Sequence, residues 1–168
     1  RAVDSEWVGA HVDTGNSMMA WEEPAAAVRA LAPYAVTTRF KDHAVIVEDG
    51  VPLVVGVPLG TGSGGCAECC RILAEESPLE RLVLEVCYAY SAPFRRPPGT
   101  GGGRLGTGAF RIAEGPFDPS RVMPRPGKVD PAGRDRLIAW QEDAVLGSLA
   151  YARDLVDGLS APAAGMPG

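Results

Sequence analysis

The feature that most constrains the fold is an alternation of strand-like and helix-like segments in the first half of the chain. Residues 7–13, 34–40 and 82–87 are rich in β-branched, aromatic and other apolar residues, which predicts three strands. Residues 21–31 and 66–76 place apolar side chains on one helical stripe, which predicts a helix between each pair of strands. Apolar strands that alternate with helices predict a parallel α/β sheet covered on both faces.

The remaining segments are expected to surround this sheet. Residues 44–48 and 51–57 flank Asp49-Gly50, a strong hairpin signal. Residues 91–128 hold 8 Gly and 7 Pro and carry a local charge of +5, so we expect a long, mobile, basic loop without a core. Residues 129–159 are expected to form a long helix, and 160–168 a flexible tail. The stripe expected to pack comprises Ile138, Val145, Leu149, Ala152 and Val156, with Trp140, Ala144, Tyr151 and Leu155 beside it.

Composition excludes several classes of protein. A chain of 168 residues suits one ordinary domain, and its formal charge of −5 disfavours nucleic acid as a partner. No apolar run approaches the roughly 18 residues of a membrane span, so no membrane partner is expected. Cys66, Cys69 and Cys70 fall on one stripe of the helix at 66–76, which favours a core role over a zinc site. Four cysteines in a chain of this length make no disulfide framework, so we expect a cytoplasmic location. The chain begins at Arg1, so we expect either a longer chain that was cut or an incomplete coding sequence.

Two carboxylates lie at predicted strand ends. Asp13 closes the first strand and Glu85 lies near the end of the third. The carboxyl ends of parallel strands face one crevice, so the two side chains are expected to converge there. Carboxylate oxygens suit a hard cation such as Mg²⁺ or Mn²⁺. In the structural alternative, Asp13 caps the turn at 14–16 and Glu85 pairs with a nearby arginine.

The two histidines are weaker candidates. His11 lies two residues before Asp13, so both side chains point to the same side of a strand. His43 follows Lys41 and Asp42 just after the second strand. Either histidine can line a site at the strand ends, or serve the core alone.

A glycine-rich loop precedes the helix at 66–76. Gly60, Gly62 and Gly65 match the dinucleotide fingerprint, and an acidic residue follows twenty residues on. Pro52 and Pro58 argue against this interpretation, because proline is disfavoured in a central strand. The backbone amides of the loop are also able to hold a phosphate or a carboxylate.

An ordered set of short motifs resembles the sugar phosphate isomerase/epimerase family, the xylose-isomerase-like TIM barrels. The resemblance covers roughly residues 7–90. The motifs are Val12-Asp13-Thr14-Gly15-Asn16, Leu31-Ala-Pro33-Tyr34, Phe40-Lys41-Asp42, Val57-Pro-Leu-Gly60-Thr-Gly62 and Leu84-Glu85.

The resemblance implies that the chain forms the last three βα units of a TIM barrel, with 129–159 as the closing helix and five strands upstream of Arg1. It also implies a divalent metal, Mn²⁺ or Mg²⁺, with Asp13 and Glu85 as ligands and Glu85 as acid/base. Arg39 stands where the family has its histidine ligand, and an arginine cannot bind a metal. Either His11 or His43 then substitutes for that ligand, or the metal site is degraded, or Arg39 itself contacts an anionic substrate; of the two histidines, we expect His11 as the further metal ligand. Asn16, Arg39, Lys41 and His43 are expected to bind the substrate.

The resulting prediction is a metal-dependent isomerase or epimerase that acts on a small sugar or keto-sugar by proton transfer next to a carbonyl. We expect the fragment alone to be inactive. Such a fragment leaves sheet edges open, which favours a homo-oligomer. The alternatives are a Rossmann-like NAD-binding oxidoreductase domain and a non-catalytic barrel remnant that binds a partner.

Overall fold

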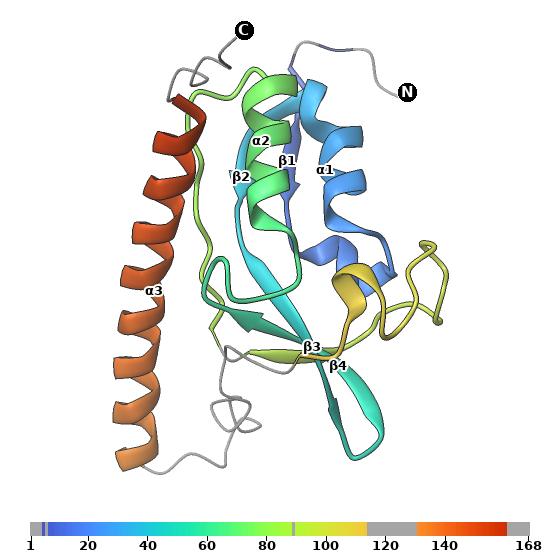
Figure 1. The fold of residues 1–168 in the computed structure, drawn as a ribbon, viewed down its shortest axis with the longest axis vertical. Helices are drawn as coiled ribbons and strands as arrows, with labels where there is room; N and C mark the ends of the chain where they lie inside the picture. The colour runs from blue at the N-terminus through green and yellow to red at the C-terminus, as the bar shows by residue number, and fades with distance from the viewer. Residues whose placement is uncertain (1–4, 6, 89, 114–130, 161–168) are drawn as a thin grey trace, which may run out of the picture.

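The chain has a mixed α/β fold with two separate sheets (Figure 1). The structure is a computed structural model that describes residues 5, 7–88, 90–113 and 131–160. The parallel sheet contains β1 (Ala10–Asp13) and β2 (Ala35–Arg39). The antiparallel sheet contains β3 (Asp42–Glu48), β4 (Val51–Val57) and β5 (Ser91–Pro93). The described strands form no closed barrel.

The third predicted strand is reduced to a single bridge beside β2. Leu84 bridges Phe40 in the parallel sense, and the Phe40 amide donates to the Val83 carbonyl at 2.8 Å. The Thr38 hydroxyl accepts a hydrogen bond from the Val83 amide at 2.8 Å and donates one to the Val83 carbonyl at 3.1 Å. The Thr38 side chain thus bonds backbone groups of Val83 that a regular strand would pair with the backbone of β2. The prediction of a strand over 82–87 is therefore wrong in extent. The parallel direction that the alternation predicted is confirmed.

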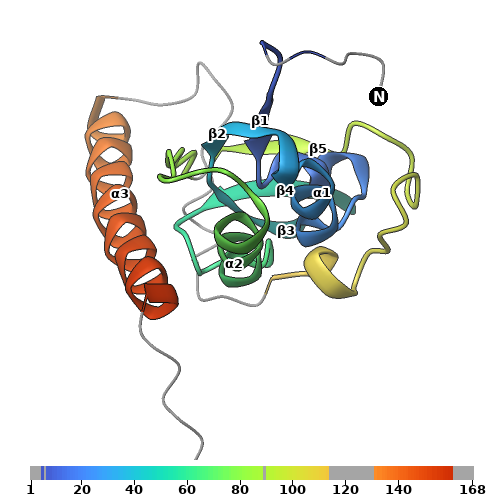
Figure 2. The same ribbon diagram turned by 90° about the horizontal axis from the view of Figure 1, so that it is seen from above.

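Two helices cover one face of the parallel sheet. In both ribbon views α1 (Pro24–Leu31) and α2 (Cys66–Glu76) lie on the same side of β1 and β2 (Figures 1 and 2). Their common core contains the predicted cysteine stripe of α2. Val36 is 65% exposed, so the expectation of helices on both faces is not met by the described residues. The members of this core are Val12, Val28, Ala32, Ala35, Phe40, Leu59, Cys66, Cys69, Cys70, Ile72, Leu73 and Ala152.

The first helix begins later than predicted. A 3₁₀ turn, η1 (Asn16–Ala20), comes first, and Trp21 follows it in the left-handed conformation with φ 63°. Pro24 then takes the first helical position, where its missing amide costs nothing. A second 3₁₀ turn, η2 (Ala32–Tyr34), leads directly into β2.

The hairpin of β3 and β4 has the predicted turn. Asp49 and Gly50 have φ values of 51° and 78°, the positive angles of a tight hairpin turn. The strand β5 adds to the far edge of β4, although it belongs to a segment predicted to be a loop.

The described part of that segment carries a core of its own. Phe94 stacks on Trp21 with ring centroids 3.9 Å apart, and Phe110 packs on both rings from η3 (Gly108–Phe110). The indole of Trp21 donates to the Arg96 carbonyl at 3.0 Å. The expectation of a coreless loop is therefore wrong for 91–113, because two aromatic residues outweigh the glycine-rich composition. The rest of that predicted loop, 114–130, lies outside the described residues.

The last helix, α3 (Pro131–Ser160), runs along one flank of the molecule (Figures 1 and 2). It buries the small residues Ala144, Ser148 and Ala152, while Ile138 and Leu149 are largely exposed. The Ser148 hydroxyl accepts the Leu59 amide at 3.1 Å, and Gln141 donates to the Val86 carbonyl at 2.7 Å. The helix was predicted correctly and its packing stripe in part, because Ala152 of that stripe and Ala144, Tyr151 and Leu155 beside it pack on the core whereas the larger Ile138 and Leu149 are exposed. The predicted tail beyond residue 160 lies outside the described residues.

Among the described residues, no helix is both long enough and apolar enough to cross a membrane.

Candidate functional site

Three charged side chains meet at the carboxyl ends of the parallel segments. Asp13 ends β1, Lys41 follows β2 by two residues, and Glu85 follows the bridge at Leu84. The Lys41 ammonium lies 3.0 Å from Asp13 Oδ2 and forms a second ion pair with Glu85 Oε2. The predicted convergence of Asp13 and Glu85 is therefore seen, with a lysine between them.

This charge cluster is largely removed from water. The Lys41 side chain is 7% exposed, and those of Asp13 and Glu85 are 16% and 34% exposed. Asp13 Oδ2 and Glu85 Oε2 are buried, and apart from the Lys41 ammonium they have no hydrogen-bond partner among the described residues. Burial alone would lower the pKa of Lys41, but its hydrogen bonds to Glu85 and Asp13 raise the pKa above its ordinary value. The lysine is therefore a stable cation.

Arg39 adds a second cation at the edge of the cluster. Its Nε lies 4.0 Å from Glu85 Oε1, and its side chain is about half exposed. The structural alternative for Glu85, pairing with an arginine, is thus present but weak beside the Lys41 pair.

Asp13 also shapes its own turn. Oδ1 accepts the amides of Gly15 and Asn16 at 3.0 and 2.9 Å, so the predicted capping role is confirmed. Oδ2 remains directed to Lys41, and the two interpretations of Asp13 hold together. Asn16 is exposed at the start of η1, three residues after Asp13 in the chain.

Two residues that support the cluster were not predicted. The Thr14 hydroxyl accepts the Lys41 amide and donates to the Lys41 carbonyl, each at 2.8 Å. Asp42 follows Lys41 in the chain, and its carboxylate accepts the backbone amide of His43. Thr14 and Asp42 lie inside two of the motifs that carry the family resemblance, so their place in those motifs was the sequence signal that could have identified them.

The two histidines have different surroundings. His43 is buried with Nδ1 3.0 Å from the Gly15 carbonyl, and burial lowers its pKa. A Cβ on Gly15 would come within 2.5 Å of this ring, so the glycine and the histidine fit each other. His11 is exposed, and its imidazole forms no hydrogen bond or ion pair with the residues that the structure describes. His43 therefore supports the turn, and the predicted roles of both histidines stay predictions.

The glycine-rich loop is filled by a side chain of the chain itself. Asp42 Oδ2 accepts the amides of Gly60 and Gly62 at 3.0 and 2.9 Å, and Oδ1 accepts that of Gly64 at 3.0 Å. The amide of His43 completes the set. The amides of Gly60, Gly62 and Gly64 are thus already occupied by a carboxylate of the chain and are not open to a phosphate.

The donors do not fit a divalent metal as they are arranged. A hard cation needs several oxygen or nitrogen ligands, and the cluster offers two carboxylates with an ammonium between them. The described part of the chain holds no group of three His, Cys, Asp or Glu side chains suited to a metal. Divalent metal binding therefore stays a prediction of the resemblance alone.

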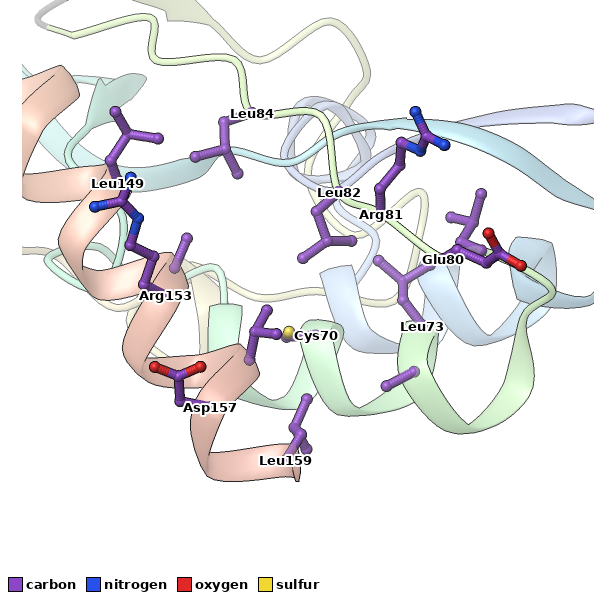
Figure 3. Close-up of a pocket in the computed structure, with 14 residues that line it drawn as sticks. Cys70, Leu73, Glu80, Arg81, Leu82, Leu84, Leu149, Arg153, Asp157 and Leu159 are labelled. Carbon is purple, nitrogen blue, oxygen red and sulfur yellow. The ribbon is translucent and has the colours of Figure 1, made fainter. Parts of the chain in front are cut away.

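A separate pocket of about 570 Å³ lies between α2, residues 79–84 and the end of α3 (Figure 3). Leu82 and Leu84 contribute to its apolar lining, and Arg153 and Asp157 lie at α3. Consecutive residues of an extended segment point to opposite sides, so Leu84 faces this pocket while Glu85 faces the cluster. The pocket is thus distinct from the charged site.

Comparison with protein-family models, with curated proteins and with solved structures found no match for this chain.

Proposed function

We propose that the cluster of Asp13, Lys41 and Glu85 is the catalytic centre of an isomerase or epimerase that acts on a small sugar or keto-sugar. The observation that carries this proposal is the meeting of three charged side chains at the carboxyl ends of three parallel segments. Active sites of α/β folds lie at this edge. The segments would then be the C-terminal βα units of a TIM barrel, closed by α3.

Glu85 is the proposed base. Its Oε2 is held by Lys41, and among the described residues Oε1 has only the distant Arg39 guanidinium as an ion-pair partner. Oε1 takes a proton from the carbon next to the substrate carbonyl. The C–H bonding pair forms a carbon–carbon double bond and the carbonyl π pair moves onto the oxygen, which gives an enediolate. For an isomerisation, the proton returns to the former carbonyl carbon while the hydroxyl proton of the neighbouring carbon passes to the oxyanion, so that the carbonyl now stands on that neighbouring carbon.

The other cluster residues position the reactants. Asp13 holds Lys41, and Asn16 and Arg39 lie at the exposed edge, where they can contact substrate hydroxyl and anionic groups. Exchange of the Glu85 proton with solvent during the reaction would leave a label in the product.

The test is solvent deuterium exchange, with the whole polypeptide that contains this sequence. We expect deuterium at the carbon next to the carbonyl of one member of a ketose and aldose panel, followed by NMR. Glu85→Gln should slow the exchange by about a hundredfold or more, because general-base catalysis contributes at least that much. Glu80→Gln, at an exposed glutamate five residues away, should leave it unchanged. Equal exchange by the Glu85 variant would refute the proposed base.

A second candidate is an interaction module without catalysis. Val36 and Val83 are exposed and line a shallow depression of about 340 Å³ at the start of β2. Exposed apolar side chains on a sheet favour coverage by another polypeptide. This candidate gains if no exchange is found and substitution of Val36 changes the association state.

A further inference from the structure

We infer that the Lys41 ammonium takes the position of the divalent metal, and that the site works without one. The inference rests on the proposed function for its chemistry. It follows from the disagreement between the metal that the resemblance implies and the donors that the cluster contains.

The ammonium already neutralises the two carboxylates. It contacts the buried oxygens Asp13 Oδ2 and Glu85 Oε2, which have no other hydrogen-bond partner in the described residues. A divalent cation between these oxygens would have to displace an ammonium that is only 7% exposed. Lys41 and the metal would otherwise be like charges at contact distance, which is strongly unfavourable away from water.

The backbone holds Lys41 in this position. Thr14 bonds both the amide and the carbonyl of Lys41, each at 2.8 Å. The following Asp42 accepts four backbone amides, including those of Gly60, Gly62 and Gly64. The lysine therefore extends from a fixed point, and its ammonium position is a built feature of the fold.

Arg39 supports the same conclusion. It stands where the resemblance expects a histidine ligand, and its guanidinium lies 4.0 Å from Glu85 Oε1. An arginine is always cationic and offers no lone pair to a metal. Glu85 is thus flanked by two permanent cations, Lys41 and Arg39.

The ammonium can supply the electrophile that the reaction needs. An ammonium has three N–H donors, and Asp13 and Glu85 take two of them. The third N–H, which has no acceptor among the described residues, is available to the substrate carbonyl oxygen. When Glu85 Oε1 accepts the carbon-bound proton, the negative charge moves to this oxygen. Lys41 stays protonated and stabilises that charge.

The experiment is a Mn²⁺ titration of the whole polypeptide, followed by electron paramagnetic resonance of the free ion. We expect no binding at the cluster up to millimolar Mn²⁺. Lys41→Met, which keeps the aliphatic length but frees both carboxylates, should gain affinity by roughly tenfold or more. Arg153→Met, at an exposed arginine of α3, should show no gain. Lys41→Arg keeps the positive charge, so it should show no gain in Mn²⁺ affinity, and it remains measurable if Lys41→Met does not fold.

Micromolar binding by the unaltered chain, lost in Asp13→Asn, would overturn the inference. Binding that Asp13→Asn leaves intact occurs elsewhere and supports it. The titration needs no turnover, so its outcome is separate from that of the exchange assay. If exchange is observed, it should survive chelation by EDTA, whereas loss of exchange and recovery with Mn²⁺ would overturn the inference.

Discussion

Single side chains in the cluster satisfy two demands at once. One oxygen of Asp13 holds the turn after β1 while the other holds Lys41. The sequence predicted Asp13 and Glu85 at neighbouring strand ends, because the strand and helix alternation fixes which ends meet. The sequence could not predict the ammonium between them, since the reach of a lysine depends on the backbone bonds from Thr14.

Removal of the ammonium should destabilise the fold. Lys41→Met leaves two largely buried carboxylates without their cation. We expect the free energy of unfolding to fall by about 3 kcal/mol, at the low end for a broken buried pair because Glu85 is one-third exposed. Urea denaturation measures this, and Arg153→Met should change it by less than about 0.5 kcal/mol. A loss as small as that of the control would mean that the cluster is solvated.

His43 should make stability depend on pH. Burial lowers its pKa in the folded chain below the ordinary value of 6.5. As the pH falls through 6.5, the unfolded chain gains a proton that the folded chain does not, so stability is lost toward acid. The loss continues until the pH reaches the lowered folded pKa.

We therefore expect the urea midpoint to fall between pH 7 and pH 5 more steeply in the unaltered chain than in His43→Gln. The difference is at most about 1.4 kcal/mol per pH unit, the limit for one proton. His11→Gln, at the other and exposed histidine, should keep the steep dependence. Parallel pH profiles for the unaltered chain and His43→Gln would contradict the assignment.

At the scale of elements, the glycine-rich loop lies where the sequence predicts it and holds a carboxylate, one of the two groups expected there, but this carboxylate is Asp42 of the chain itself. Its amides surround the Asp42 carboxylate, and a Cβ on Gly62 would lie 2.5 Å from Asp42 Oδ1. The sequence pattern for an external phosphate and for an internal carboxylate is the same, because both need closely approaching amides. Only the tertiary position of Asp42 distinguishes them.

Gly62→Ala should therefore destabilise the loop. We expect a cost of about 1–3 kcal/mol, because backbone and a carboxylate leave no room for a methyl group. Gly147→Ala, in the middle of α3 with open space around it, should instead stabilise by about 0.5–1 kcal/mol. Thermal unfolding of both variants tests the contrast, and a neutral Gly62→Ala would show that the loop is loose.

The long helix shows where hydrophobicity misleads. The larger members of the predicted stripe, Ile138, Leu149 and Val156, are exposed, whereas α3 packs through Ala144, Ser148 and Ala152 with Tyr151 and Leu155 beside them. Hydrophobic periodicity reports the spacing of apolar residues and cannot detect that loop backbone at Leu59 lies against the helix at Ser148.

Enlarging the packed stripe should detach α3. Ala152→Leu adds three carbons at a buried position, and we expect a loss of about 1–3 kcal/mol. Ala150→Leu makes the same change at an exposed position two residues away and should be near neutral. Hydrogen exchange along α3 reports the detachment, and equal protection in both variants would contradict the observed packing.

At the scale of the whole molecule, local sequence patterns predicted the order and direction of the strands and helices better than they predicted which faces of the sheet are covered and which residues form the cores. The parallel pairing of β1 with β2 and the helices between the strands followed from periodicity. The core of Trp21, Phe94 and Phe110 did not, since Trp21 lies more than 70 residues before the two phenylalanines, which stand in a glycine-rich segment. Contacts of that range depend on the assembled fold.

The uncovered face of the parallel sheet leads to the last prediction. Val36 is 65% exposed and Val83 is 49% exposed, on segments whose other side carries the helices and core. Water contact with these side chains favours burial against a further polypeptide. We expect the 168-residue chain to self-associate in light scattering as concentration rises, and Val36→Lys to weaken this association by about tenfold or more, as a charge introduced at an apolar contact would.

A lysine at a second exposed valine provides the comparison. Val47 is 45% exposed at the hairpin of β3 and β4, away from the parallel sheet, and Val47→Lys should leave the association unchanged. Equal effects of the two lysines would indicate association through general hydrophobicity. A monomer at every concentration would mean that the exposed face alone does not drive self-association. If this sequence is part of a longer polypeptide whose further strands cover this face, Val36→Lys should destabilise that polypeptide instead, because the same valine would then be buried within one chain.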